Sequence, residues 1–78
     1  MNNEILLRLM IMRNGKVYEA YLDERLSFRE NFDYLQQLIG EDLSSAIVYD
    51  PNKKLFLDEN VPLKEYRISF FMLLELFV

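Results

Sequence analysis

Only one segment of the chain has the spacing of an amphipathic helix. Its apolar residues recur at intervals of four, three and four, which places them on one helical face: Phe28, Phe32, Leu35 and Ile39. Ser27 and Glu30 have the spacing of a capping box before this stripe, and Gly40 suits the left-handed position after it. The pattern predicts a helix over residues 28–39. One helix cannot bury its own stripe, so a sheet must pack against it.

Strand patterns flank this helix on both sides. We expect strands over residues 4–12, 17–22, 46–50, 54–57 and 70–78. The Asn14-Gly15 pair predicts a hairpin turn between the first two strands. A helical turn is expected near residues 63–66. The last strand is the most apolar, so we expect it at the centre of the sheet and parallel to the first strand.

Composition and length restrict the possible functions. A chain of 78 residues predicts a single domain spanning residues 1–78, and 51% hydrophobic residues suffice for a small core. The chain has no Cys and no His, so it lacks thiolate ligands and the usual neutral-pH acid–base group. Its adjacent acidic pairs are expected in solvated turns: Asp23-Glu24, Glu41-Asp42 and Asp58-Glu59. We therefore expect no enzymatic activity, no metal and no cofactor.

The charge and the hydropathy pattern bear on partners and location. A formal net charge of −4 disfavours binding to a phosphate backbone, so no nucleic-acid partner is expected. The apolar runs 5–12 and 70–78 are shorter than the ~20 residues that a membrane-spanning helix needs. The N-terminus has no signal-peptide pattern. We expect a cytoplasmic protein without membrane insertion.

The segment from Leu57 to Val78 resembles the corresponding part of ubiquitin. It contains the pattern Leu-x-x-x-x-x-Leu-x-x-Tyr-x-Ile, followed by the alternating Leu74-Glu75-Leu76. The resemblance implies an α+β fold of the ubiquitin-like β-grasp class, with a mixed four- to five-stranded sheet packed on one α-helix. It also implies that Tyr66 buries its ring and bonds a nearby backbone group through its hydroxyl.

The chain carries no diglycine tail, which disfavours conjugation and sulfur transfer. Without that tail it is similar to the YukD/EsaB family of small bacterial proteins encoded with type VII (WXG100) secretion systems. This resemblance implies a non-catalytic accessory or regulatory factor that binds a component of the secretion machine. Two alternatives stay open: a ubiquitin- or sulfur-carrier-type protein lacking its diglycine tail, and a structural homodimer whose sheet faces pair.

The outer face of the predicted sheet is the one candidate site. If Leu74 and Leu76 face the helix, as the resemblance places them, their neighbours in the strand face away, and Arg8 must also face away. The side chains that we expect on a protein-binding outer face are Leu6, Met10, Tyr21, Val48, Leu73 and Phe77. So many apolar residues on a wet face favour a contact surface, although scattered apolar surface is normal in soluble proteins.

Overall fold

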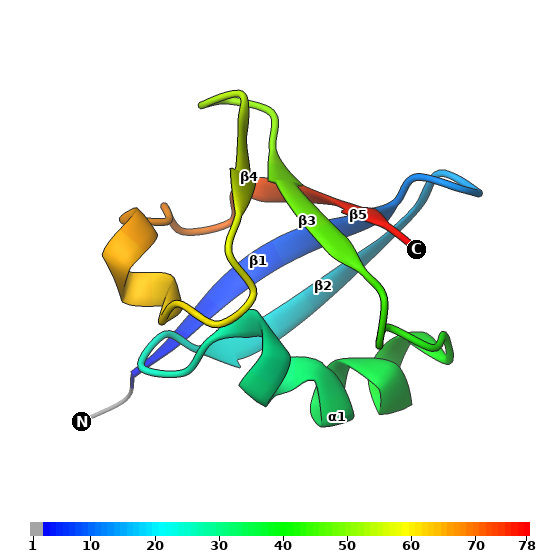
Figure 1. The fold of residues 1–78 in the computed structure, drawn as a ribbon, viewed down its shortest axis with the longest axis horizontal. Coiled ribbons are helices and arrows are strands. Elements are labelled where there is room, and N and C mark those ends of the chain that lie inside the picture. Colours follow the sequence, from blue (N-terminus) through cyan, green and yellow to red (C-terminus); the bar gives the residue numbers. More distant parts are fainter. Residues whose placement is uncertain (1–2) are drawn as a thin grey trace.

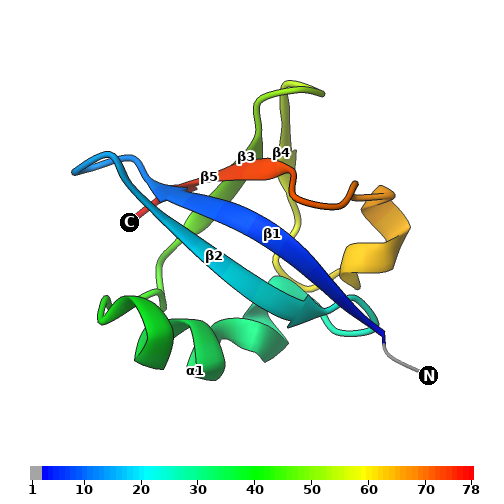
Figure 2. The ribbon, with the colours of Figure 1, turned by 180° about the vertical axis from the view of Figure 1, so that it is seen from behind.

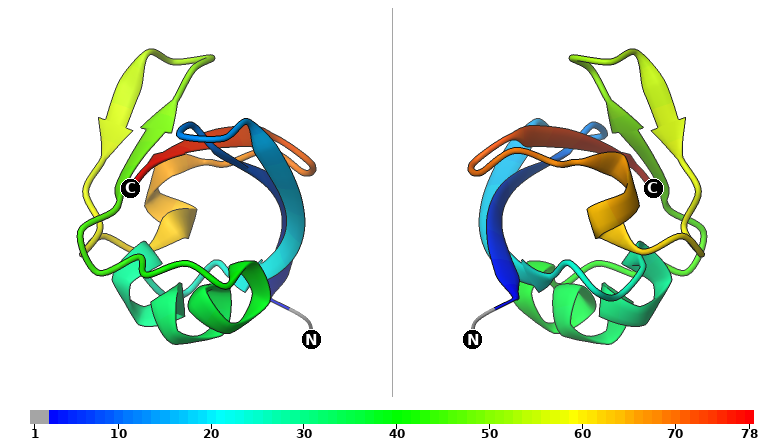
Figure 3. Two further views of the ribbon diagram at one scale, coloured as in Figure 1. Left: turned by 90° about the vertical axis from the view of Figure 1, so that its right-hand side faces the viewer. Right: turned by 90° about the vertical axis from the view of Figure 1, so that its left-hand side faces the viewer.

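The computed structural model describes residues 3–78 as one curved sheet wrapped around one helix (Figure 1). Its elements are β1 (Glu4–Ile11), β2 (Lys16–Asp23), α1 (Phe28–Ile39), β3 (Ile47–Asp50), β4 (Leu55–Leu57), the 3-10 helix η1 (Leu63–Tyr66) and β5 (Leu73–Phe77). α1 lies under the concave side of the sheet, as the end-on views show (Figure 3). The expected element types and their order are confirmed, and the differences are at the ends of the strands.

The last strand occupies the middle of the sheet. The strand order is β2-β1-β5-β3-β4 (Figure 2). β5 runs parallel to β1, with Leu73 opposite Arg8, and antiparallel to β3, with Phe77 opposite Ile47. The prediction of a central closing strand parallel to the first one is therefore confirmed. This arrangement leaves β2 and β4 at the two margins.

Local side-chain chemistry fixes both ends of α1. The Glu30 amide donates to Ser27 Oγ at 3.2 Å, and the Ser27 amide donates to Glu30 Oε1 at 3.1 Å. This reciprocal pair satisfies two amides that the first helical turn leaves free. Gly40 ends the helix with a φ of 77°, which a residue with a Cβ adopts only with strain. The predicted helix bounds are confirmed.

The core lies between the helical stripe and the central strand. Leu74 and Leu76 are 0% and 1% exposed, and they belong to the same apolar cluster as the buried side chains of α1. The remaining members of that cluster with no exposed surface are Leu7, Leu9, Ile11, Leu22, Leu43, Phe28 and Leu35. Each buried Leu contributes roughly 1.5–3 kcal/mol. In a chain this short, burial of this kind is the main favourable contribution to folding.

The segment before β5 is a turn, and the expected strand over 70–78 is wrong at its start. Phe71 has a φ of 61°, in the left-handed region that is an outlier for a bulky residue. Its amide donates to the Leu6 carbonyl at 2.7 Å, which ties the turn to β1. Apolar side chains at Phe70 and Phe71 resemble a strand in the sequence, but the backbone there reverses direction and β5 begins at Leu73.

Tyr66 connects η1 to the loop after β4. The Asp58 amide donates to Tyr66 Oη at 2.7 Å, so the predicted bond between the Tyr66 hydroxyl and a nearby backbone group is confirmed. The ring packs against the core but is only half-buried, so the expected burial of the ring is partial. The Lys53 ammonium donates to the Tyr66 carbonyl from the β3–β4 turn. Together these bonds hold three segments that are distant in sequence.

We expect Tyr66→Phe to lower the free energy of unfolding by about 0.5–1.5 kcal/mol, the net value of one such hydrogen bond. Urea unfolding followed by circular dichroism measures this change. Tyr34→Phe is the matched control, because Tyr34 lies on an exposed part of α1 and its substitution should leave stability unchanged. Equal stability of the two variants would show that the Tyr66 hydroxyl contributes nothing to the fold.

Candidate functional site

The side chains that point away from α1 form the outer face of the sheet. They alternate along each strand with the buried positions, and the strand registers align them in rows across the sheet. The outer face comprises Glu4, Leu6, Arg8, Met10, Val17, Glu19, Tyr21, Asp23, Ile47, Tyr49, Phe56, Leu73, Glu75 and Phe77. Five of these fourteen side chains are charged, and two of the five, Glu4 and Asp23, are opposite each other at one end of the β1–β2 pair. The face is therefore more apolar than a sheet face that only contacts water.

Five of the six residues predicted for this site lie on the outer face. Tyr21 is 54% exposed and Phe77 is 41% exposed. Leu6, Met10 and Leu73 are half-buried by their neighbours in the sheet. The structure thus brings these five side chains to one side of the sheet, and their role in binding stays a prediction.

Val48, the sixth predicted residue, faces the core, and its assignment to the outer face is wrong. It is 1% exposed and lies opposite Leu76 and Leu57, both of which are buried. The residues of β3 on the outer face are Ile47 and Tyr49 instead. The sequence does not indicate which residues of β3 point inward, because Asp50 is polar and yet buried on the same side as Val48. The Asp50 carboxylate accepts hydrogen bonds from the backbone amides of Asn52 and Lys53, at 2.9 and 3.2 Å.

An aromatic cluster of Tyr49, Phe56 and Phe77 dominates the outer face over β3, β4 and β5. The ring centroids of Tyr49 and Phe56 are 4.7 Å apart, and each lies within 6.5 Å of the Phe77 ring. Phe56 is 59% exposed. Sequence reasoning missed Tyr49 and Phe56. The signal was present in β4, where a buried Leu57 requires its neighbour Phe56 to point outward.

Charged groups on the outer face lie apart from the aromatic cluster or at its border. Glu75 is opposite both Met10 and Tyr49 and is half-buried between them. The Arg8 guanidinium lies 4.7 Å from the centroid of the Phe71 ring, and its Nε donates to the Phe71 carbonyl at 3.1 Å. The Arg8 side chain therefore binds the turn before β5 through Phe71. Glu75 is the one charge placed among the apolar side chains of the central strands.

Two carboxyl groups have lowered pKa values: Asp23 at the end of β2 and Asp42 in the loop after α1. The Arg25 side chain donates to Asp23 at 2.8 and 3.0 Å and lowers the pKa of that carboxyl. The Ser44 amide donates to Asp42 at 2.9 Å and lowers the pKa of the Asp42 carboxyl. A lowered pKa suits a turn cap and is the opposite of what a general acid needs near neutral pH. Within residues 3–78, no group of three or more acidic side chains is arranged to hold a metal ion.

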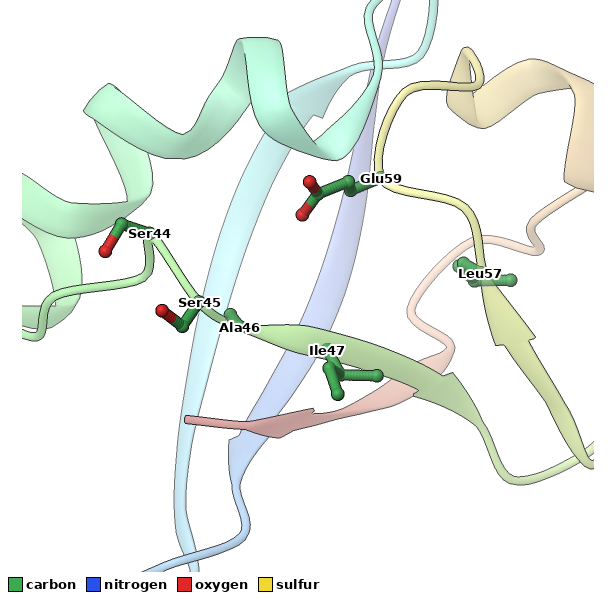
Figure 4. Close-up of a pocket in the computed structure, with 6 residues that line it drawn as sticks. All are labelled: Ser44, Ser45, Ala46, Ile47, Leu57 and Glu59. Carbon is green, nitrogen blue, oxygen red and sulfur yellow. The ribbon is translucent and has the colours of Figure 1, made fainter.

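A shallow hollow of about 370 Å³ lies between the segment that leads into β3 and the end of β4. It is lined by Ser44, Ser45, Ala46, Ile47, Leu57 and Glu59 (Figure 4). Its polar groups do not converge: the two serine hydroxyls point away from the Glu59 carboxylate, which pairs with Arg29. The hollow therefore lacks the convergent polar groups of a small-molecule site.

Solved structures share this architecture along nearly the whole chain. A protein designed de novo on the basis of ubiquitin has a TM-score of 0.79 at 17% identity, covering 97% of this chain and 89% of its own. The N-terminal ubiquitin-like domain of the 4931431F19Rik protein has a TM-score of 0.78 at 12% identity, with coverages of 100% and 77%. The fold is ubiquitin-like.

A ubiquitin-like domain of an Arabidopsis thaliana protein is similar to the same degree, with a TM-score of 0.79 at 17% identity, covering 99% of this chain and 79% of that chain. No protein-family model and no curated protein matches the sequence. The resemblance to the YukD/EsaB family therefore depends on the residue pattern alone. Among the described residues, no helix is long and apolar enough to cross a membrane.

Two lysine substitutions in adjacent residues of β3 test the corrected orientation of this strand. Val48→Lys should lower the free energy of unfolding by about 3 kcal/mol or more, because it buries an unpaired ammonium. Tyr49→Lys should cost about 1 kcal/mol, the value of the lost aromatic contacts. Thermal unfolding of the two variants measures both effects. A reversed order of stability would return Val48 to the outer face.

Proposed function

We propose that this chain is a non-catalytic protein-interaction module that binds a protein partner through the outer face of its sheet. The observation that carries the proposal is the aromatic cluster of Tyr49, Phe56 and Phe77. Phe56 and Phe77 are 59% and 41% exposed although they contact each other and Tyr49. Large exposed apolar patches mark interaction sites more often than they mark ordinary surface.

The geometry of the outer face suggests what the partner offers. Aromatic side chains are enriched at the centre of protein interfaces, where they fill apolar pockets. The partner surface that fits is therefore apolar over β3, β4 and β5. Glu75 lies at the border of the cluster beside Tyr49, so a basic side chain of the partner at that point would keep the carboxylate from being buried unpaired.

We further propose that the module is a cytoplasmic accessory or regulatory factor of a bacterial type VII secretion system. Support comes from the residue pattern over Leu57–Val78 and from the capped helix, which resemble the YukD/EsaB family. The ubiquitin-like fold agrees with what that resemblance implies. The partner would then be a component of the secretion machine, and the natural candidate is the cytoplasmic part of its membrane ATPase.

Phe56→Lys combined with Phe77→Lys should weaken binding to that ATPase segment by about a hundredfold or more, because the variant removes two anchors from the interface. Isothermal titration calorimetry with the purified segment measures the affinity. The matched control, Gln37→Lys with Asn52→Lys, adds the same charge at exposed positions outside the outer face and should bind normally. Circular dichroism checks that both variants fold.

Equal weakening in the control would assign the effect to charge, and unchanged binding of the first variant would remove the outer face as the site. The genomic neighbourhood tests the secretion assignment separately. Genes for a WXG100 protein and a membrane ATPase beside this one are expected. Their absence would end the secretion proposal without affecting the interaction face.

A further inference from the structure

The margin of the sheet formed by β2 is a long and regular strand edge. β2 has eight residues and pairs with β1 through an unbroken register from Glu4 opposite Asp23 to Ile11 opposite Lys16. It lies at the end of the strand order (Figure 3), and it has no proline and no bulge. β4, at the other margin, has only three residues. Proteins usually shorten, bend or charge such edges because open backbone groups pair with other strands.

The hydrogen bonds of β1 show which residues of β2 face the open edge. The Arg8 and Met12 amides donate toward β5, at 2.9 and 3.0 Å, so the even-numbered residues of β1 bond on that side. On the other side of β1, the Glu24 amide donates to the Asn3 carbonyl at 3.0 Å. The even-numbered residues of β2 therefore bond to β1. The residues whose amides and carbonyls point to the open edge are Val17, Glu19 and Tyr21.

We propose that β2 of a second copy pairs antiparallel with this edge, about a twofold axis at Ala20 that is perpendicular to the sheet. This register places Glu19 opposite Tyr21 of the second copy in a hydrogen-bonded pair. The Ala20 residues of the two copies are opposite each other at the axis. They form a non-hydrogen-bonded pair, in which the strands are close and a small side chain fits. Lys16 lies opposite Glu24 of the second copy, and this charge complementarity occurs twice. The result is a continuous sheet of ten strands.

Neighbouring registers place like charges together. An axis at Glu19 sets that carboxylate against its own copy, and an axis at Tyr21 sets Glu19 against Asp23. Like charges directly opposite in an antiparallel pair are destabilising. The register about Ala20 avoids both clashes, and it keeps the odd-numbered residues in the hydrogen-bonded pairs that the backbone of β2 requires.

Exposed apolar residues on α1 lie beside the same edge. Asn31 Nδ2 donates to the Asp23 carbonyl at 3.4 Å, so this flank of the helix faces β2. Tyr34 and Leu38 follow Asn31 by three and seven residues and continue that flank, and they are 47% and 41% exposed. An axis perpendicular to the sheet brings the two helices to the same side, where these side chains of both copies cover one another.

Such a dimer presents both outer faces on one side of the continuous sheet. A partner with two binding segments can then engage both copies at once, and the second contact forms at a raised effective concentration. The inference thus extends beyond the proposed interaction face, and it does not require that face to be the binding site. Its tests use the chain alone.

Tyr21→Glu and Tyr21→Lys form a matched pair that tests the register. Sedimentation equilibrium of the unmodified chain should give twice the 9.4 kDa of one copy at high concentration. Tyr21→Glu sets one new carboxylate against Glu19 of the second copy on each side of the axis and should raise the dissociation constant about tenfold, because the clash occurs twice. Tyr21→Lys faces the same carboxylate with opposite charge and should dimerise as well as the unmodified chain.

Amide hydrogen exchange followed by NMR locates the contact. Glu19 and Tyr21 should exchange rapidly in dilute solution and become protected as concentration rises, because each amide donates to the carbonyl of the other residue in the second copy. Tyr18 and Ala20 stay protected throughout because they bond to β1. A single-copy mass up to about 1 mM would overturn the proposal. Equal effects of the two Tyr21 substitutions, or a dimer whose concentration-dependent protection lies outside β2, would overturn it as well.

Discussion

The contact between the central strand and the single helix determines the rest of this structure. Leu74 and Leu76 of β5 have almost no exposed surface and share a cluster with the apolar stripe of α1. Because β5 lies between β1 and β3, its inward side chains set the inward phase of both neighbours through their registers: Leu74 lies opposite Leu9, and Leu76 opposite Val48. Each outward side chain is then fixed by alternation. The candidate binding face is thus a consequence of core packing, since the same constraint that buries one side of each strand displays the other.

The fold could be predicted where the sequence rules are local. Ser27, Glu30 and Gly40 set the helix bounds through bonds within a few residues, and the stripe between them has one period. The start of β5 could not be predicted in this way. Phe70 and Phe71 are apolar in either conformation, and the reversal at Phe71 depends on bonds to β1 from residues that are far away in sequence: Leu6 accepts its amide and Arg8 covers its ring. A left-handed Phe is a costly conformation, and these two contacts from one strand keep it in place.

The candidate site was predictable on β1, β2 and β5, where a charged residue marks the outward phase. Arg8, Glu19 and Glu75 point away from the helix. The apolar residues two positions from each of them in the same strand therefore point away as well. β3 carries no such marker. Its one charged residue, Asp50, points inward and accepts hydrogen bonds from two amides of the following turn. In the sequence, a buried Asp that caps a turn cannot be distinguished from an Asp that faces water. The misassignment of Val48 and the omission of Tyr49 have this single cause, because a shift of one residue exchanges the faces of a strand.

The two proposed surfaces are compatible because they use different parts of the same sheet. The aromatic cluster lies over β3, β4 and β5, where side chains supply the contact area. The edge of β2 lies at the opposite margin, where backbone groups supply directional bonds. Tyr21 belongs to the outer face, opposite Leu6, yet its amide and carbonyl point to the open edge. Backbone pairing at that edge leaves the outward side chains of β2 in place. One copy can therefore pair through β2 while the aromatic cluster, which lies two to four strands away along the sheet, stays free for a partner.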